Sequence, residues 1–230
     1  MKKLILLAVV LGAVLLIPSM TMCDEERLLS VSGHGEITVD PDIAYITFGV
    51  STVADTAEKA TSRNEASMYN IVSALKYAGI SKDNIETNTY DLNPVVDRSA
   101  AGKGKTTGYR CDNQIVVTVT DLSTIGTLID AAIDGGANAV NGLRFTVKDE
   151  SKYKISSLEE AVKNATAKAK AIEKAADIKI KGVKSINESG VLVRPVEFSV
   201  MSMNAIRGSE TPIEAGKVTI SADVQMNFEY

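Results

Sequence analysis

The chain contains no tryptophan, a single histidine (His34) and only two cysteines (Cys23 and Cys111) among its 230 residues. A zinc centre needs several histidine, cysteine or carboxylate ligands at defined spacings, so this scarcity argues against one. No Gly-x-Ser-x-Gly sequence and no cysteine–histidine pair supports a nucleophilic enzyme. We therefore expect no metal site and no cofactor, and a fold that depends on packing without disulfide bonds.

An excess of positive charge is also lacking. The chain has 25 lysines and arginines against 29 aspartates and glutamates, a formal net charge of −4. If residues 1–22 are removed, the loss of Lys2 and Lys3 lowers the net charge to −6. A mildly acidic chain with interspersed signs argues against nucleic acid or an anionic membrane surface as a partner.

The N-terminus has the features of a secretory signal, a short basic start followed by an apolar run from Leu4 to Ile17. This run is shorter than the roughly 20 residues that a membrane-spanning helix needs. An uncleaved anchor is the alternative, because no clean A-x-A-like cleavage site is present. Lipid attachment at Cys23 would need a small residue before it, and Met22 is a poor substitute. We predict a signal peptide or anchor at residues 1–23, a domain at residues 24–230, and an extracytoplasmic location, periplasmic or at the cell surface.

The stretch from Leu28 to Val53 predicts two strands around a turn, which we interpret as a hairpin. Apolar and polar residues alternate in its second half, as in a half-buried strand. The turn is placed at Asp40-Pro41-Asp42, where the missing N–H of proline is tolerated. Gly33 and Gly35 predict a bulge in the first strand or the close approach of another backbone.

Helical and strand periods alternate after this stretch. The predicted helices run from a cap at Asp55 or Thr56 to Gly79, and over Leu122–Ile133, capped by Asp121 or Ser123. The predicted strands are Ile85–Val96, Tyr109–Thr120 and Asn138–Lys148. Alternation in the last of these places Ala139, Asn141, Leu143, Phe145 and Val147 on one side. From Ile43 the order is strand, helix, strand, strand, helix, strand, which is the ferredoxin-like order. We expect this part to form one antiparallel sheet with both helices on one face.

A third, longer helix is predicted from Ser156 or Ser157 to Ala176, with a narrow stripe of small residues that permits close approach. Strand signals resume at Ile180–Val193, and alternation over Lys217–Tyr230 predicts a terminal strand of about 45 Å. Such a strand must curve, bulge or extend beyond its sheet. The segment Arg194–Gly216 is a loop or an arm on a neighbouring subunit.

The predicted fold class is therefore α+β. It combines an antiparallel sheet of ferredoxin-like βαββαβ order with an added N-terminal strand, the long third helix and two C-terminal strands.

His34 with Asp40 or Asp42 is the grouping that an acid–base enzyme would use. The histidine has no further partner pattern, and the aspartates flank Pro41, where they shape and solvate a turn. We favour structural roles for all three. An enzyme would require these side chains to converge within hydrogen-bond reach in one cleft.

Other polar residues have structural interpretations as well. Asn64 lies on the apolar stripe of the first helix and is predicted to bond a neighbouring backbone group, and Cys111 is predicted to be a small core or edge residue. The loop Ser99–Thr106 contains Gly-Lys-Thr, but it joins two strands and lacks the first glycine of a phosphate-binding loop. Asn164 and Asn187 begin glycosylation triplets, which matter only in a host that glycosylates exported proteins.

The chain after residue 23 resembles the SIMPL domain family over nearly its whole length. The matching sequences, in order, are Val31 to Glu36, Val39 to Ala44, Asn64 to Met68, Ala78 to Ile80, Ile85 to Thr87, Gly108-Tyr109, Gly135 to Asn138, Phe145, Ala161 to Ala171, and the terminal strand. Two departures are local: Cys111 replaces an alanine-like residue, and Asp177 replaces the usual glycine after the long helix.

This resemblance implies an exported α+β protein that can form oligomers and is associated with envelope or stress phenotypes and with protein interaction. It implies no catalytic motif that could be transferred to residues of this chain.

From these observations we predict a non-enzymatic, extracytoplasmic protein. We expect it to form homo-oligomers through its long terminal strand and the Arg194–Gly216 segment, with an envelope or protein partner. The alternative is a module that binds a small molecule or glycan in a groove beside the sheet. An enzyme using His34 is the third hypothesis.

Overall fold

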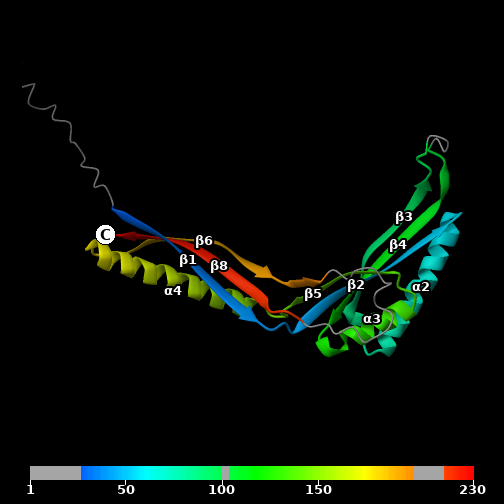
Figure 1. Ribbon diagram of the computed structural model, residues 1–230, viewed down its shortest axis with the longest axis horizontal. Helices are drawn as coiled ribbons and strands as arrows, with labels where there is room; N and C mark the ends of the chain where they lie inside the picture. The colour runs from blue at the N-terminus through cyan, green and yellow to red at the C-terminus, as the bar shows by residue number, and fades with distance from the viewer. Residues whose placement is uncertain (1–26, 100–103, 199–214) are drawn as a thin grey trace, which may run out of the picture.

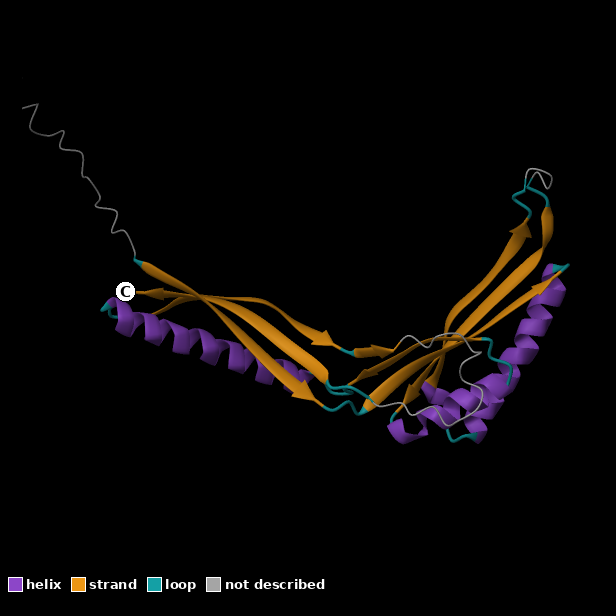
Figure 2. Cartoon of the chain, viewed as in Figure 1, coloured by secondary structure: helices purple, strands orange, loops and turns teal. Residues whose placement is uncertain are grey.

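The computed structural model describes residues 27–99, 104–198 and 215–230. Within these ranges the chain forms two antiparallel sheets that follow one another along an elongated, bent molecule (Figure 1). One sheet has five strands in the order β3-β4-β2-β5-β7, and the other has three in the order β1-β8-β6. Helices lie along one face of each sheet (Figure 2), which confirms the predicted α+β class.

The five-stranded sheet contains the predicted ferredoxin-like unit. The order of its strands along the chain and across the sheet confirms the split βαβ arrangement, in which β4 lies between β3 and β2. The elements are β2 (Ile43–Ala54), α2 (Ala57–Tyr77), β3 (Ile85–Val96), β4 (Thr106–Val119), α3 (Ile125–Asp134) and β5 (Ala139–Thr146), joined at the edge by β7 (Val196–Phe198).

Local signals set the ends of these helices as predicted. The Thr56 side chain accepts a hydrogen bond from the backbone N–H of Lys59 at the start of α2, and Gly79 takes a positive φ of 101° just after its end. The second helix begins one turn later than predicted, because Asp121 caps a short 3-10 turn before α3 starts.

One face of β5 differs from the prediction. Gly142 adopts a φ of 110° beside a break in the pairing with β2, so the alternation changes phase there. Val140 is buried and Asn141 is exposed, the reverse of strict alternation from Leu143. The predicted position of Asn141 on the same side as Leu143 was therefore wrong.

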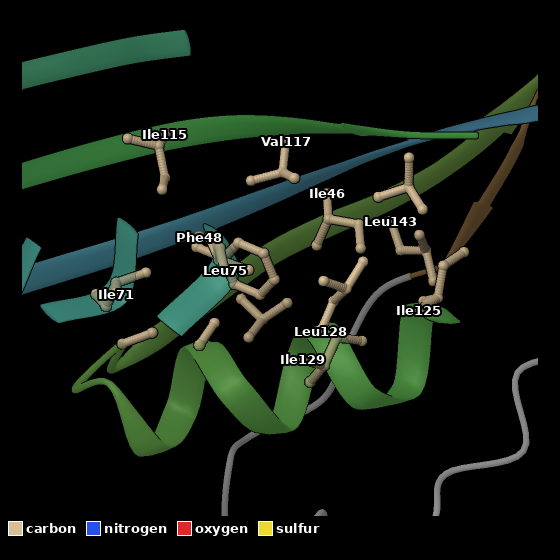
Figure 3. Packing of buried hydrophobic residues seen from close by; sticks show 14 of the residues in the cluster. Ile46, Phe48, Ile71, Leu75, Ile115, Val117, Ile125, Leu128, Ile129 and Leu143 are labelled. Carbon is tan, nitrogen blue, oxygen red and sulfur yellow. The ribbon is translucent and has the colours of Figure 1, made fainter. Parts of the chain in front are cut away.

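The main core lies between this sheet and its two helices. Phe48 of β2 and Leu75 of α2 are fully buried there, and side chains from the sheet and from both helices pack together (Figure 3). The labelled core residues are Ile46, Phe48, Ile71, Leu75, Ile115, Val117, Ile125, Leu128, Ile129 and Leu143.

The three-stranded sheet is built from both ends of the chain. It consists of β1 (Leu28–Val39), β8 (Val218–Glu229) and β6 (Gly182–Arg194), with α4 (Ser151–Ala176) on one face. β1 pairs with β8 in unbroken register from Leu28↔Glu229 to Val39↔Val218. The backbone N–H of Tyr230 also donates to the carbonyl of Arg27, so both ends of the described fold meet at one tip.

The predicted hairpin between the first two strands was therefore wrong. β1 pairs with β8, whereas β2 pairs with β4 and β5, and the chain passes through Asp40-Pro41-Asp42 from one sheet into the other. Alternation identifies strands without identifying their partners, and the partner of β1 lies at the far end of the chain. A second crossing occurs at Pro195, where β6 leaves the three-stranded sheet and β7 joins the five-stranded one.

The terminal strand was expected to curve, bulge or extend beyond its sheet, and the last of these alternatives does not occur. β8 has 12 residues, and β1 matches it residue for residue. The bulges occur in its other neighbour, β6, whose pairing shifts between Val183 and Ser185 and between Glu188 and Val191. The predicted set of two C-terminal strands becomes three, because the short β7 follows β6.

Gly33 and Gly35 bring α4 into direct backbone contact with β1. A Cβ atom on Gly33 would lie 2.1 Å from the carbonyl oxygen of Ala161, and one on Gly35 would lie 2.1 Å from that of Ser157. The register of β1 is unbroken, so these glycines serve close approach and form no bulge. The helix ends at Asp177, which adopts a left-handed φ of 51°.

Replacing Gly33 with alanine is expected to lower the free energy of unfolding by about 3 kcal/mol, because the helix backbone must move away from the strand. Gly182→Ala is the matched control, since a Cβ atom there meets nothing within 4 Å. Urea unfolding of both variants tests this. Equal midpoints for Gly33→Ala and the wild type would contradict the close contact.

Candidate functional site

His34 lies in the middle of β1 on the face of the sheet that points away from α4. The flanking glycines face the helix, so alternation directs the imidazole outward. Its Nδ1 is 2.8 Å from the Oδ1 of Asp223 on β8, and its Nε2 is 3.8 Å from the Oε2 of Glu36. The hydrogen bond that Asp223 accepts from the imidazole is the main cause that raises the pKa of His34, and Glu36 adds to it.

A row of short polar side chains continues across the same face. The Ser30 hydroxyl donates to the Oδ1 of Asn227 at 2.6 Å, and the Nδ2 of Asn227 donates to the Ser185 hydroxyl at 2.9 Å. Gln225 donates to Ser30 at 2.8 Å. These bonds tie β1, β8 and β6 together, and the surface they form is open and polar.

Asp40 and Asp42 do not converge with His34. They lie six and eight residues further along the chain, about 20 Å or more along an extended strand. Asp40 is 4.0 Å from the Nζ of Lys217, and the Oδ1 of Asp42 accepts the backbone N–H of Lys148 at 2.7 Å. The hypothesis of an acid–base site made by these three residues was wrong, and the partners of His34 are Asp223 and Glu36.

Sequence reasoning missed Asp223 because β8 is nearly two hundred residues away along the chain. The pairing of His34 with Asp223 follows from the register between β1 and β8, which alternation alone does not reveal. Once the terminal strand is known to pair with β1, Asp223 on its polar face is the obvious neighbour.

Asn64 and Cys111 occupy the predicted structural positions. Both are fully buried, and the side-chain amide of Asn64 donates to the carbonyls of Val50 and Cys111 at 2.9 and 3.0 Å. Burial is the main cause that raises the pKa of the Cys111 thiol, so it stays protonated and is a poor nucleophile. Tyr90 of β3, which the register places opposite Asn113, lowers the pKa of the same thiol, an effect smaller than that of burial.

The other candidate motifs also lack a site geometry. The loop Ser99–Thr106 joins β3 to β4 as predicted, although residues 100–103 lie outside the described part. Asn164 uses its Oδ1 to accept the backbone N–H of His34 at 3.3 Å. Asn187 is an exposed residue of β6.

Groups that could hold a metal or enclose a ligand were sought in the same part of the chain. Residues 27–99, 104–198 and 215–230 contain no cluster of three or more histidine, cysteine, aspartate or glutamate side chains able to hold a metal ion. No helix there has the length and apolar character needed to cross a membrane. A shallow groove of about 340 Å³ lies on α4, lined by Val162, Lys163, Thr166, Ala167 and Lys170. The predicted signal peptide or anchor lies outside the described residues.

Comparison with known proteins identifies the family. The family model SIMPL, described as "Protein of unknown function (DUF541)", matches residues 29–228. The chain belongs to the SIMPL family. It is 28% identical to the "26 kDa periplasmic immunogenic protein" of Brucella abortus strain S19 over 217 residues, which cover 90% of this chain and 86% of that protein.

Other SIMPL relatives are matched over a shorter length. The "Uncharacterized protein YggE" of Edwardsiella ictaluri is 26% identical over 141 residues, 61% of this chain and 59% of that protein. The protein of the same name from Escherichia coli K12 is 27% identical over 138 residues, 60% of this chain and 56% of that protein.

The His34–Asp223 pair predicts a pH dependence of stability. The pKa of His34 is raised in the folded protein. The pair therefore stabilises the fold fully at pH values below the ordinary pKa of 6.5, and this stabilisation is lost as the pH rises through the raised pKa. The difference in Tm between the wild type and His34→Gln is therefore expected to be larger at pH 5 than at pH 9. Thermal unfolding across this range measures it. Asp223→Asn should remove the same pH-dependent part, and parallel curves for all three proteins would contradict the pairing.

Asp42 is expected to stabilise the junction between the two sheets. Asp42→Ala removes the acceptor of the Lys148 N–H and should lower the free energy of unfolding by about 1 kcal/mol. Asp40→Ala is the matched control, because the Asp40 side chain is 85% exposed and only approaches Lys217, and it should change stability by less than about 0.5 kcal/mol. Denaturant titration compares the two, and equal losses would refute a special role for Asp42.

Proposed function

We propose that this SIMPL protein is a non-enzymatic, extracytoplasmic protein that self-assembles and acts through protein contacts in the cell envelope, in roles related to envelope integrity or stress. The observation that carries the proposal is the open edge of each sheet. β3 and β6 are exposed on both faces along almost their whole length. Surfaces of this kind are used for contacts with other proteins.

The shape of the fold supports a contact role more than an enclosed site. Side chains that could have formed a catalytic group lie apart, and the shallow groove is lined by a single helix. Two sheets placed end to end offer long faces to a partner (Figure 2). Small-molecule sites have a different geometry, because they use a compact pocket in which a few polar groups converge.

The extracytoplasmic location rests on two observations. The N-terminal sequence has a basic start and an apolar run typical of a secretory signal. A relative that matches 90% of the chain is named a periplasmic protein. We propose the same compartment for this chain.

The route of assembly that we propose differs from the one predicted from the sequence, which used the terminal strand and the Arg194–Gly216 segment. β8 is the central strand of its sheet, and both of its edges are paired, with β1 and with β6. β8 therefore has no free edge to which a second copy could add a strand, and we propose assembly through other surfaces. Most of the Arg194–Gly216 segment, residues 199–214, lies outside the described part.

Self-assembly is tested by sedimentation velocity on the protein purified after expression and export of the full chain. The apparent mass is expected to rise with concentration above that of one chain, because exposed apolar strands are buried on association. A single species of monomer mass at every concentration, including the highest that stays soluble, would overturn this proposal. A dilution series in the same buffer distinguishes reversible assembly from irreversible aggregation.

A further inference from the structure

The helix α4 covers two of the three strands beneath it. Ala161 and Ala165 pack on β1 and β8, and Asn164 and Lys168 hydrogen-bond to the backbone of β1 at His34 and Ser32. The helix is thus held toward the β1 edge of the sheet, and β6 lies on the far side of β8 (Figure 1). Most of the helix-side face of β6 is left open, although Val191 packs at the border of the core beneath α4.

This open face is apolar. The register places Val183 opposite Phe228 and Ile186 opposite Met226, and these partners on β8 are buried on the helix side. Val183 is 51% exposed and Ile186 is 54% exposed. We define the β6 strip as the helix-side residues of this strand: Val183, Ile186, Glu188, Val191 and Val193.

The free edge of β6 is poorly suited to pairing with another strand. Two bulges interrupt it, and Gly190 adopts a φ of 102° inside the second. Bulges of this kind break the row of backbone donors and acceptors that an added strand needs. A partner is therefore expected to bind the face of β6 and leave its edge unpaired.

The outward flank of α4 has properties that complement the β6 strip. We define the α4 flank by the residues along the outer side of the helix: Ile155, Glu159, Val162, Lys163, Thr166, Ala167 and Lys170. Val162 lies at the inner border of this flank, where it also packs against the core that contains Ala161 and Ala165. Ile155 is 59% exposed, and the shallow groove of about 340 Å³ lies at the centre of the flank. A shallow apolar hollow can receive exposed side chains such as Ile186.

The charges on the β6 strip and the α4 flank are also complementary. In the part of the chain that the structure describes, Glu159, Lys163 and Lys170 form no ion pair, and neither does Glu188 within the β6 strip. Lys163 and Lys170 flank the hollow, whereas Glu188 sits among apolar residues. Opposite charges beside matching apolar surfaces favour one partner and one orientation.

We propose that the β6 strip of one copy binds the α4 flank of a second copy, and that the reverse contact forms at the same time around a two-fold axis. This contact is a specific form of the self-assembly proposed above, and the inference rests on that proposal. The lengths agree, because a helix of 26 residues spans about 39 Å and a strand of 13 residues about 43 Å. A reciprocal arrangement closes on itself and gives a dimer.

Two substitutions on one strand test the face that is used. Ile186→Asp puts a charge into the centre of the β6 strip and should weaken dimerisation at least about tenfold. Leu192→Asp is the matched control, because Leu192 is 52% exposed on the opposite face of the same strand. It should leave the dimer dissociation constant unchanged. Sedimentation velocity measures both, and circular dichroism confirms that each variant folds.

A charge exchange tests the partner surface. Glu188→Lys and Lys170→Glu should each weaken the dimer, since each places like charges in contact, and the double variant should restore most of the affinity. Rescue in the double variant supports the contact between the strip and the flank. Equal weakening by the single and double variants would overturn it.

The outcomes separate this inference from the proposal on which it rests. Self-association that Ile186→Asp and Leu192→Asp leave equally strong would show that assembly uses another surface, which overturns the inference and leaves the proposed function standing. A wild-type protein that remains monomeric overturns the self-assembly and the site together.

Discussion

The contact between α4 and β1 at Gly33 and Gly35 determines how the three-stranded sheet is arranged. A helix that packs through side chains lies about 10 Å from a sheet, but here the backbones touch because neither glycine has a Cβ atom. This closeness lets Asn164 and Lys168 reach the backbone of β1 and satisfy groups at an otherwise open edge. The same placement draws the helix away from β6. One edge of the sheet is therefore closed, and the opposite strand keeps an apolar face in solvent.

The two sheets are joined by strands that leave one and enter the other. The Asp40-Pro41-Asp42 link carries β1 into β2, and Pro195 lies between β6 and β7. At the first link the backbone N–H of Asp42 donates to the carbonyl of Thr146 while its carboxylate accepts the N–H of Lys148. Proline suits both crossings because it cannot donate to a ladder. The residues that drew attention to this stretch of the sequence therefore have structural roles. Gly33 and Gly35 allow the close approach of α4, and Asp42 holds the junction between the sheets.

Local patterns in the sequence predicted the elements well and their partners poorly. The helix that begins after Thr56, the strand Ile85–Val96 and the buried face containing Cys111 follow from capping residues and alternation, which act over a few residues. The ferredoxin-like order followed from the sequence of these elements. The pairing of β1 with β8, the ion pair between His34 and Asp223, and the offset of α4 all depend on contacts between distant segments. The position of Asn141 on β5 was missed because the phase change at Gly142 has no signature in alternation.

The pairing of the first described strand with the last has a consequence for the order of folding. Ser30 and Asn227 are 197 residues apart, so closing this sheet requires a loop that includes almost the entire chain. The five-stranded unit is complete by residue 146 apart from the short β7 and can form earlier from more local contacts. β1 then has no strand partner until β8 (Val218–Glu229) is available. During that interval the backbone edge of β1 is open to wrong pairing, which makes β1 a segment that a chaperone would protect.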